Sequence, residues 1–373
     1  MKIAITSPYD FSVPGGVQTH IVELSRELSQ RGNEVTIFAP LSLTNIHTLD
    51  DVEFIDLGKP VTFSFLGSKT RISLNIFKII KSIRIIKKNN FDIIHIHEPL
   101  IPSQILINIF TNITKIATFH AYSDKKNYVY YLLNFVLKFM VKRFSYKICV
   151  SKFSQKYINK YFSFNSSIIP NGINVSNFSN DLRTTEKLNN NLPKICFIGR
   201  FDEPRKGFST LLSSYIELKK EYQELKLVVA GPGDKKIFSN QIIKDISFLG
   251  TINQNDLPDL YKKVDIVCLP SISNESFGIV ILESMASGSI LVASDIESYK
   301  DILNKNNYGF MFNVGSSDHL SKVLSQIISK KIETKENIEN GLKNVLKYSW
   351  VKIVSEIINI YSNEIKTNHR GKI

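Results

Sequence analysis

The sequence predicts an α/β protein that contains two doubly wound parallel sheets. Apolar segments of strand length alternate with amphipathic segments of helix length, as in residues 195–198 and then 208–223. This alternation occurs twice, before and after an Asn-, Ser- and Thr-rich stretch at residues 174–191. Continuous apolar strands separated by helices are typical of parallel sheets covered on both faces. We therefore predict two Rossmann-like domains whose carboxyl edges face a central cleft.

The order of the predicted elements sets the domain boundaries. Helices are predicted between several strands of the first half and between or after those of the second, including residues 17–31, 256–263, 277–286 and 318–329. The predicted strands are residues 2–7, 34–39, 91–96, 115–120, 146–150, 167–170, 194–199, 226–230, 247–249, 265–269, 290–293 and 309–312. This order gives a first domain at 1–173 and a second at 174–350. A final helix at about 351–366 can pack on either domain, including back on the first.

The composition is that of a soluble globular protein, with 43% apolar and 22% charged residues. The net charge of +13 is unevenly spread, because residues 1–190 carry 23 Lys and Arg against 13 Asp and Glu. A basic first half implies an acidic partner, and both nucleic acid and an anionic membrane surface qualify. The three cysteines show no pairing pattern and no secretory signal is visible, so a cytoplasmic location is expected.

The loop at residues 199–207 is the first candidate binding site. Arg200, Arg205 and Lys206 follow the apolar strand at 195–198 and precede the helix at 208–223. Ligands of an open α/β sheet bind at this carboxyl edge, and helix starts there favour anions. Fixed cations at such an edge predict a diphosphate that is held, and stabilised as it leaves, without a metal ion.

Two glutamates flank a predicted helix start downstream of this loop. Glu275 lies just before the helix and Glu283 about two turns inside it. Between them Phe277, Gly278 and Ile279 offer free backbone N–H groups to a phosphate. Carboxylates on both sides of an anion site can accept hydrogen bonds from sugar hydroxyls. Together with the basic loop, this pattern indicates a nucleotide-sugar site.

Candidate residues in the first half follow its strands. Gly15 and Gly16 join the first strand to the first helix and allow close approach of a ligand, although a plain tight turn fits equally well. His120 ends a strand and is expected at the same edge. His95 and His97 share one side of a strand; we predict a structural role for the first and a cleft-lining role for the second. No third ligand with recognisable spacing appears, so no metal site is predicted.

A basic amphipathic helix is predicted within residues 74–88. Its cations Lys78, Lys81, Arg84 and Lys88 stand against a row of isoleucines, a pattern that fits binding to anionic lipid. An ordinary surface helix with a buried apolar stripe gives the same pattern. A second candidate surface is the aromatic-rich stretch at 128–144, with its cations Lys125, Lys126, Lys138, Lys142 and Arg143.

These motifs, taken in order, resemble the retaining glycosyltransferases of the GT-B fold in their fourth sequence family. Within it the similarity is greatest to the phosphatidyl-myo-inositol mannosyltransferases. Four segments carry the resemblance, which covers nearly the whole chain: residues 7–9 with 13–18 (Ser-Pro-Tyr and Val-Pro-Gly-Gly-Val-Gln), 95–99 (His-Ile-His-Glu-Pro), 199–207, and 275–280 (Glu-Ser-Phe-Gly-Ile-Val).

The resemblance implies a role for each matching residue. Arg200 and Lys206, with Arg205 nearby, would hold the donor diphosphate, which Gly16 approaches. Glu283 would bind the donor ribose, and Glu275 the sugar hydroxyls, while His120 would lie at the transferred sugar. The inositol phosphate acceptor would be surrounded by Tyr9, Gln18, Arg71 and Lys125.

The resemblance also implies the substrates and the setting of the reaction. The donor would be a nucleotide sugar, most simply GDP-mannose, and the acceptor an inositol phospholipid at the inner face of the cell membrane. The protein would associate with this anionic membrane surface peripherally. No cofactor, nucleic acid or obligate protein partner is implied.

The site residues favour one reaction course. No carboxylate is placed as an obvious nucleophile on the far face of the sugar, so we expect front-face transfer with retention, in which the leaving diphosphate is neutralised by Arg200, Lys206 and the helix start. Transfer from another nucleotide sugar, or to another lipid or soluble inositol or sugar acceptor, is an alternative. A sugar-nucleotide epimerase is a second rival. A non-catalytic basic binding protein is a third, and it would leave the paired glutamates unexplained.

Overall fold

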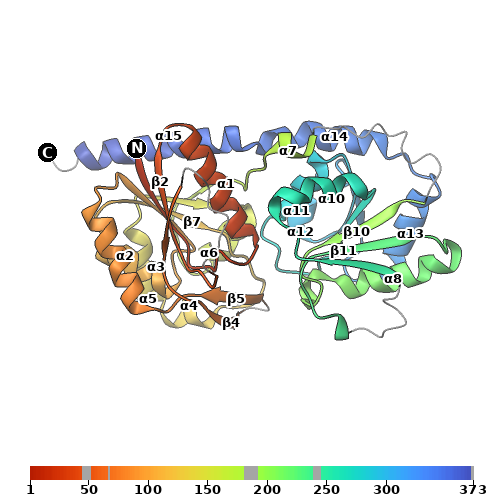
Figure 1. Cartoon of the computed structure of the whole chain (residues 1–373), viewed down its shortest axis with the longest axis horizontal. Coiled ribbons are helices and arrows are strands. Elements are labelled where there is room, and N and C mark those ends of the chain that lie inside the picture. The colour runs from red at the N-terminus through yellow and green to blue at the C-terminus, as the bar shows by residue number, and fades with distance from the viewer. Residues whose placement is uncertain (44–51, 66–67, 180–191, 238–244, 371–373) are drawn as a thin grey trace. The chain divides into compact units, whose positions relative to one another are not determined.

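The computed structural model describes residues 1–43, 52–65, 68–179, 192–237 and 245–370, and it divides into two compact units (Figure 1). Unit 1 comprises residues 1–172 together with 350–373, and unit 2 comprises residues 173–349. Each unit contains its own parallel sheet with helices on both faces, which confirms the predicted α/β fold with two parallel-sheet domains.

Unit 1 is built on a seven-stranded sheet in the order β3-β2-β1-β6-β7-β8-β9, and all its neighbouring strands are parallel. A separate antiparallel hairpin, β4-β5, lies outside this sheet. The strands are β1 (Lys2–Thr6), β2 (Glu34–Ala39), β3 (Glu53–Asp56), β4 (Val61–Phe65), β5 (Ser68–Ile72), β6 (Ile93–His97), β7 (Thr114–Phe119), β8 (Tyr146–Cys149) and β9 (Ser167–Ile168).

Helices cover both faces of this sheet, because each face carries its own apolar core. One core joins the sheet to α1 and α15, and the other joins it to α2, α3, α5 and α6. The helices of unit 1 are α1 (Gly16–Gln30), α2 (Ile76–Lys88), α3 (Pro102–Phe110), α4 (Tyr128–Leu132), α5 (Asn134–Lys142), α6 (Lys152–Asn159) and α15 (Trp350–Arg370). The final helix α15 packs on α1 and β7, so the end of the chain belongs to unit 1.

Unit 2 holds a six-stranded parallel sheet in the order β12-β11-β10-β13-β14-β15. Its strands are β10 (Lys194–Ile198), β11 (Lys226–Ala230), β12 (Ile246–Gly250), β13 (Ile266–Leu269), β14 (Ile290–Ser294) and β15 (Phe310–Phe312). Its helices are α7 (Val175–Ser179), α8 (Phe208–Glu221), α10 (Leu257–Lys263), α11 (Ile279–Ala286), α12 (Glu297–Leu303), α13 (Ser317–Ile328) and α14 (Lys335–Val345). This strand order is that of the dinucleotide-binding doubly wound fold. The first three strands are added toward one edge of the sheet, and the fourth strand lies on the other side of the first, so the order of strands reverses there.

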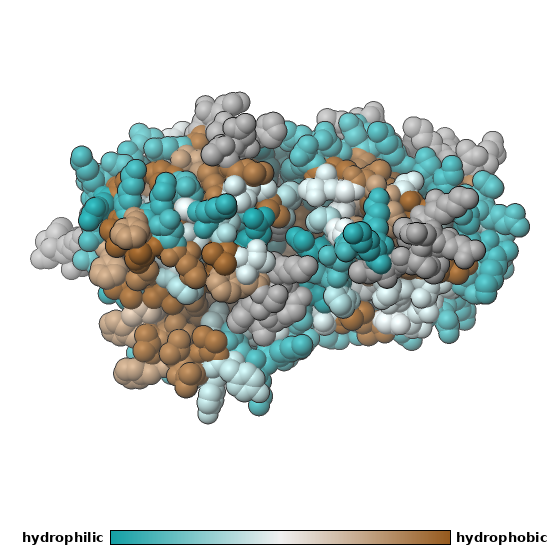
Figure 2. Space-filling view, turned by 60° about the horizontal axis from the view of Figure 1, so that its bottom comes forward, coloured by the Kyte–Doolittle hydropathy of each residue, from teal (hydrophilic) through white to brown (hydrophobic). Residues whose placement is uncertain are grey.

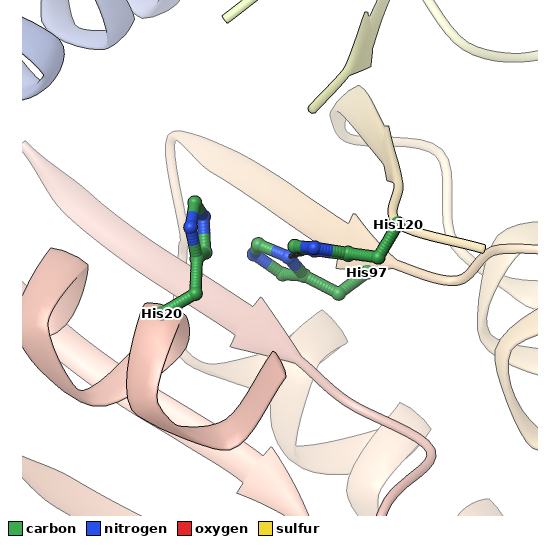
Figure 3. Close-up of side chains that lie close together, drawn as sticks. All are labelled: His20, His97 and His120. Atoms are coloured by element: carbon green, nitrogen blue, oxygen red, sulfur yellow. Dashed lines mark hydrogen bonds between the residues drawn. The ribbon is translucent and has the colours of Figure 1, made fainter. Parts of the chain in front are cut away.

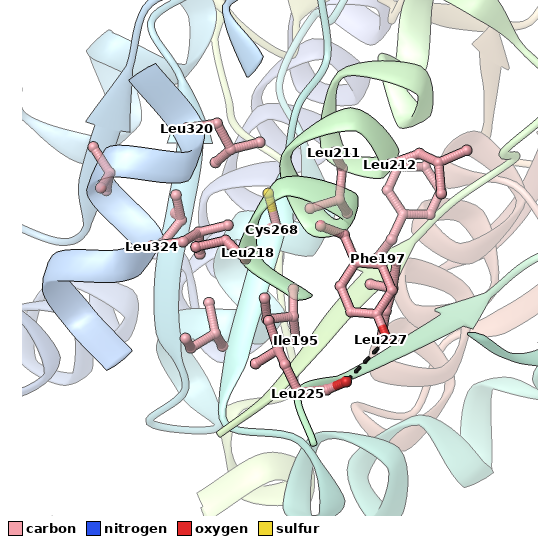
Figure 4. Packing of buried hydrophobic residues seen from close by; sticks show 14 of the residues in the cluster. Ile195, Phe197, Leu211, Leu212, Leu218, Leu225, Leu227, Cys268, Leu320 and Leu324 are labelled. Carbon is pink, nitrogen blue, oxygen red and sulfur yellow. Dashed lines mark hydrogen bonds between the residues drawn. The ribbon is translucent and has the colours of Figure 1, made fainter. Parts of the chain in front are cut away.

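The core of unit 2 explains why its apolar runs form strands. On one face, leucines of α8 and α13 pack on β10 and β11, around Ile195 and Phe197 (Figure 4). The buried Tyr215 of α8 donates its hydroxyl hydrogen to the carbonyl oxygen of Leu225 at 2.9 Å, so its polar tip is satisfied inside the core. Cys149, Cys196 and Cys268 are all buried thiols.

The structure corrects several predicted elements. Residues 175–179 of the proposed linker form helix α7, whereas the rest of the proposed linker, 180–191, lies outside the described residues. Helix α11 begins at Ile279 and not at 277, because Gly278 in the left-handed region caps it. Strand β3, the β4-β5 hairpin and helix α14 were not predicted. Among the described residues, no helix is long and apolar enough to cross a bilayer.

Candidate active site

The sheet topology indicates one candidate ligand site in each unit. In unit 2, β10 lies beside β13 at the point where the strand order reverses, so the loops after these two strands meet. In unit 1, β1 lies beside β6 in the same way. Ligands of open α/β sheets bind at such points, outside the carboxyl ends of the strands.

The loop after β10 carries the predicted cations and folds as the short 3-10 helix Pro204–Lys206. It ends at Gly207, whose φ of +68° lies in the left-handed region. A Cβ atom at this position would lie 1.8 Å from the carbonyl oxygen of Pro270, in the loop after β13. The N–H of Ile272 donates to the Arg205 carbonyl oxygen at 2.8 Å, which ties the two loops together.

Glu275 lies against the predicted cations. Its Oε1 atom accepts from Lys206 Nζ at 2.6 Å and from Arg205 Nη1 at 3.0 Å, and Ser271 Oγ lies 3.3 Å away. Burial raises the pKa of the Glu275 carboxyl, but the charges of Lys206 and then Arg205 outweigh burial, so this pKa falls below its ordinary value. Glu275 is therefore ionised at neutral pH.

A second carboxylate, Glu203, completes the cluster and was not singled out in the sequence. It lies 3.4 Å from Arg200 Nε and 2.9 Å from Arg205 Nη2. Among the described residues, the ion pairs given for Arg200, Arg205 and Lys206 are with two carboxylates, Glu203 and Glu275, and all three cationic side chains are partly buried. The cluster keeps an excess of positive charge, which suits a bound anion.

The start of α11 lies directly after Glu275. Gly278 has a φ of +88°, and a Cβ atom there would lie 3.0 Å from the ring of Tyr299. The same tyrosine donates to Ser271 Oγ at 3.0 Å, next to Glu275. The residue before this N-cap glycine, Phe277, is buried. Packing of Phe277 and the Tyr299–Ser271 hydrogen bond therefore both hold the start of α11.

Glu283 is also buried, on the second turn of α11. Its Oε2 atom accepts from the Tyr261 hydroxyl at 2.8 Å, and Gln254 also bonds to the carboxyl. Burial raises the pKa of Glu283 to about 6, which these two hydrogen bonds partly offset. The carboxylate is oriented by its neighbours, and its role toward a ribose stays a prediction.

In unit 1, three of the four predicted acceptor residues meet around Asp10. This buried carboxylate lies 3.3 Å from Arg71 Nη1, and its backbone N–H donates to the Arg71 carbonyl oxygen. Gln18 donates to the Asp10 carbonyl oxygen at 3.1 Å. Tyr9 pairs through its backbone with Ile72. Asp10 was not singled out in the sequence, although an acidic residue in the loop after the first strand was a usable signal.

The remaining residues of this loop are placed differently. Gly16 is exposed at the first turn of α1, and the side chain of Gln18 lies over Gly15. Lys125 is exposed, and its backbone N–H donates to Ser123 Oγ at 3.1 Å. Among the described residues, no hydrogen bond or ion pair links Lys125 to Tyr9, Gln18 or Arg71.

Glu98 fixes the backbone around His120. Its Oε1 atom accepts from the N–H groups of His120 at 2.6 Å and Ala121 at 2.7 Å, and Glu98 itself has a positive φ of 50°. Burial raises the pKa of the Glu98 carboxyl to about 7, although these two hydrogen bonds lower it. Burial and then the Glu98 charge raise the pKa of Tyr9 well above its ordinary value, so its phenol stays neutral.

His20, His97 and His120 form a buried cluster at the same edge (Figure 3). Each offers a ring nitrogen, and these nitrogens lie within 4.8 Å of one another. His97 Nδ1 and His120 Nε2 are 2.9 Å apart. Burial lowers the pKa of His20 to about 4 and the pKa values of His97 and His120 well below their ordinary values, so the rings are neutral. Neutral imidazoles of this number can hold a divalent metal ion.

One prediction about the histidines needs correction. His97 is fully buried and does not line an open surface; it contacts His120 instead. His97 lies instead with two histidines that the sequence spacing did not bring together, since His20 comes from α1 and His120 follows β7. That the protein holds no metal ion stays a prediction. His95 contacts the Tyr361 hydroxyl and Thr118 Oγ1, both at 2.6 Å, and is structural as predicted.

The predicted membrane helix is α2. Lys78, Lys81, Arg84 and Lys88 are exposed, whereas Ile79, Ser82, Ile83 and Ile86 are buried. Lys78 lies 3.5 Å from Asp56 and is therefore partly neutralised. Lipid binding by these cations stays a prediction.

The buried Glu98 gives stability a specific pH dependence. Folding raises the pKa of Glu98 from the ordinary value of 4.5 to about 7. The folded state therefore binds the Glu98 proton more tightly than the unfolded state, and the stability that this proton contributes is complete below about pH 4.5 and is lost as the pH rises through 7. Glu98→Gln keeps an acceptor for both N–H groups without the charge. Through Glu98, the unmodified protein should lose about 2–3 kcal/mol of unfolding free energy between pH 5 and pH 8, and we expect Glu98→Gln to abolish this loss.

Urea unfolding at pH 5 and pH 8 measures this effect. Glu98→Ala is the matched variant, because it leaves the N–H groups of His120 and Ala121 without an acceptor and is expected to lose about 1–3 kcal/mol at both pH values. A Glu98→Gln protein with the same pH dependence as the unmodified protein would show that Glu98 is not the titrating group.

Comparisons with known families cover both units. Residues 14–177 match the family described as Glycosyltransferase Family 4, and residues 179–344 match the family described as Glycosyl transferases group 1. The phosphatidyl-myo-inositol mannosyltransferase of Propionibacterium freudenreichii subsp. shermanii is 31% identical over 369 residues, which are 97% of this chain and 95% of the relative. The enzyme of the same name from Mycobacterium leprae is 29% identical, covering 97% and 96%.

Solved structures share the fold over nearly the whole chain. A glycosyltransferase from Rickettsia africae has a TM-score of 0.74 at 23% identity and covers 98% of both chains. The HepE protein of Anabaena, solved with UDP and glucose, has a TM-score of 0.73 at 18% identity and covers 97% of this chain and all of its own.

Proposed function

Because the chain belongs to the family 4 glycosyltransferases of the GT-B fold, we propose that it transfers an α-mannosyl residue from GDP-mannose to phosphatidyl-myo-inositol with retention of configuration. The observation that carries this proposal is the cluster of Arg205 and Lys206 around Glu275 at the reversal point of the unit 2 sheet. Full-length similarity to enzymes named for this reaction supports the choice of sugar and acceptor.

The donor diphosphate is assigned to unit 2. Lys206 and Arg205 approach Glu275 closely, so an incoming diphosphate finds cations that are already in place and only partly neutralised. Arg200 and the start of α11, where Gly278 provides no side-chain cap, add to this anion site. Since these groups are fixed before the reaction, they stabilise the charge that develops on the leaving diphosphate at little reorganisation cost.

Glu275 acts in this scheme as an ionised acceptor. With its pKa held low, its carboxylate accepts hydrogen bonds from sugar hydroxyls and keeps Lys206 in position when no donor is bound. Glu283 is the proposed ribose acceptor. Glu275 stays ionised throughout the reaction. The bond from the anomeric carbon to the diphosphate oxygen breaks as the acceptor hydroxyl oxygen bonds to the same face of that carbon, and the leaving diphosphate takes the proton of the acceptor hydroxyl.

The acceptor is assigned to unit 1. Arg71 is anchored by Asp10 and by backbone pairing, with its guanidinium partly exposed, which suits a phosphate of an inositol phospholipid. Tyr9 and Gln18 lie beside this arginine as neutral hydrogen-bond donors. His120, held by Glu98, is the proposed contact of the transferred sugar.

We further propose that transfer needs no resident metal ion, because the cations of unit 2 supply the charge that a metal would otherwise provide. Activity is therefore expected to be unchanged after dialysis against EDTA. The histidine cluster makes this a demanding test, since it is the part of the described structure where three side chains are arranged to hold an ion. Loss of activity that added Zn²⁺ or Mn²⁺ restores would contradict the proposal.

The experiment that tests the function is a panel of nucleotide sugars, each incubated with and without liposomes that contain phosphatidylinositol. We expect a mannosylated lipid to form from GDP-mannose only when the inositol lipid is present. Transfer from another donor, or to a soluble acceptor, would identify the broader alternative. An isomerised donor formed without any acceptor would overturn the proposal in favour of an epimerase.

A further inference from the structure

The buried histidine cluster of unit 1 is held by one helix and by the ends of two strands. His97 is the last residue of β6 and His120 directly follows β7, and these strands are parallel neighbours. His20 lies in α1, and the three rings are turned toward one another (Figure 3). Side chains on such regular elements are placed more precisely than side chains on loops, so the cluster is a preformed arrangement.

The ring nitrogens of this cluster have nearly the spacing of a metal site. One nitrogen from each ring lies within 4.8 Å of the other two. Zn²⁺ binds imidazole nitrogens at about 2.0–2.1 Å, so tetrahedral coordination needs nitrogens about 3.3 Å apart. The nitrogens therefore need to close by at most about 1.5 Å, which rotation of the side chains can supply. Three imidazoles leave one coordination position open.

One ring nitrogen of the cluster has no partner in the described structure. His97 is fully buried, and its Nδ1 atom lies 2.9 Å from His120 Nε2. Its Nε2 atom has no hydrogen-bond partner among the described residues. Buried polar atoms are nearly always paired, and an unpaired one costs free energy. A cation bound among the three rings, with His97 turned toward it, would give this nitrogen a partner.

The donor set selects the class of ion. Imidazole nitrogens suit Zn²⁺ and related transition-metal ions, whereas Mg²⁺ and Ca²⁺ take oxygen ligands. Glu98 is the carboxylate next to His97 in the chain, but its Oε1 atom accepts from the backbone N–H groups of His120 and Ala121. In the part of the chain that the structure describes, the candidate ligands of this cluster are therefore histidines alone.

The cluster is accessible only through one of its members. Exposed apolar side chains gather on one side of unit 1 (Figure 2), and the histidines are not among them. His20 and His97 are 3% and 0% exposed, whereas His120 is 6% exposed. An ion therefore enters past His120, the residue to which the proposed function assigns the transferred sugar.

We propose that His20, His97 and His120 reversibly bind one Zn²⁺ ion, or a related transition-metal ion, and that this ion inhibits sugar transfer by occupying His120. The inhibition rests on the proposed function, because it assumes that His120 contacts the sugar, but the binding of the ion does not. The ion is not a cofactor, since transfer proceeds without it. The metal-free protein that the sequence predicts is therefore the active form.

The single tryptophan of the chain, Trp350, can report on the cluster. Its buried ring has its centroid 5.1 Å from that of His20. The full chain is first dialysed against EDTA and then freed of the chelator. Added Co²⁺ should quench the Trp350 emission and saturate at one ion per chain, because a paramagnetic ion quenches a nearby indole. Zn²⁺, which has a filled d shell, should displace Co²⁺ and restore the emission, whereas Mg²⁺ should not.

His97→Phe tests the site directly, because it keeps an aromatic ring in place and removes both ring nitrogens. We expect it to weaken Co²⁺ binding at least ~10-fold, since loss of even an outer-shell partner of a metal ligand costs that much. The matched control is His319→Phe, which makes the same change on α13 of unit 2 and should leave Co²⁺ binding unchanged.

A measurement on the unmodified protein keeps the test valid if His97→Phe does not fold. Zn²⁺ is added to protein whose histidines are labelled with ¹⁵N, and the ring nitrogen resonances are followed. The resonances of three of the seven histidines should shift together. Zn²⁺ should inhibit sugar transfer over the same range of concentration.

The outcomes separate this inference from the proposed function. The inference would be overturned by Trp350 emission that Co²⁺ leaves unchanged, by quenching that His97→Phe does not weaken, or by full transfer in protein saturated with Zn²⁺. Quenching that Zn²⁺ reverses, in a protein that transfers no sugar, would support the ion site and reject the proposed function. Transfer to phosphatidylinositol in a protein that shows no quenching would do the opposite.

Discussion

Lys206→Ala is expected to lower the turnover of sugar transfer at least ~10²-fold at saturating donor, because a fixed positive charge on the leaving diphosphate is lost. The same change removes the largest influence that lowers the pKa of Glu275. Burial then raises the pKa of Glu275 with less opposition. As the pH is lowered, Glu275 should therefore become protonated, and the activity of the variant should be lost, at a higher pH than in the unmodified protein.

Steady-state kinetics with varied donor, repeated between pH 5 and pH 9, measure both effects. Lys220→Ala is the matched control, because Lys220 lies on α8 of the same unit, is 69% exposed and forms a surface ion pair with Glu217. It should transfer sugar at the normal rate. Near-normal turnover in Lys206→Ala would show that the basic loop does not stabilise the leaving group.

Gly207→Ala is expected to cost about 4 kcal/mol or more of unfolding free energy and to abolish donor binding. A side chain at a φ of +68° is strained by about 1–2 kcal/mol. The larger cost comes from the Cβ atom, which would lie 1.8 Å from the Pro270 carbonyl oxygen and push apart the loops after β10 and β13. Lys206 would then lose its contact with Glu275.

Gly250→Ala separates the two causes. Gly250 has nearly the same backbone conformation, with a φ of +70°, but in the described part of the chain, its two sequence neighbours aside, no atom lies within 4 Å of a Cβ atom built there. It should cost only about 1–2 kcal/mol. Urea unfolding of both variants, with calorimetric titration of GDP, measures the difference. Equal costs at the two positions would mean that the contact between the two loops does not shape the site.

The sequence predicted the parts of the fold that depend on local patterns. Apolar runs such as residues 195–198 and amphipathic runs such as 208–223 form β10 and α8 because burial on both faces selects them. Short elements were missed where the pattern is weak. Strand β3 has only two apolar residues, between two charged ones, over four positions, and α7 lies at the edge of a polar stretch.

The site was predictable where its residues are neighbours in sequence. Arg205 and Lys206 precede an apolar helix, and Glu275 precedes another, so the strand order alone brings them together. The pairing of Asp10 with Arg71, and the contact of His20 with His97 and His120, join residues far apart in the chain. Such contacts depend on helix orientation and loop paths, which local patterns do not determine.

The central claim is that the cations of unit 2 hold the diphosphate of a nucleotide. Calorimetric titration of GDP and UDP, each compared with its own nucleoside, tests it most directly. We predict that at least one diphosphate binds ~10²-fold or more tightly than its nucleoside, and that replacing Arg200 and Lys206 by Ala removes most of this difference. Equal affinities for nucleotide and nucleoside in the unmodified protein would contradict the claim.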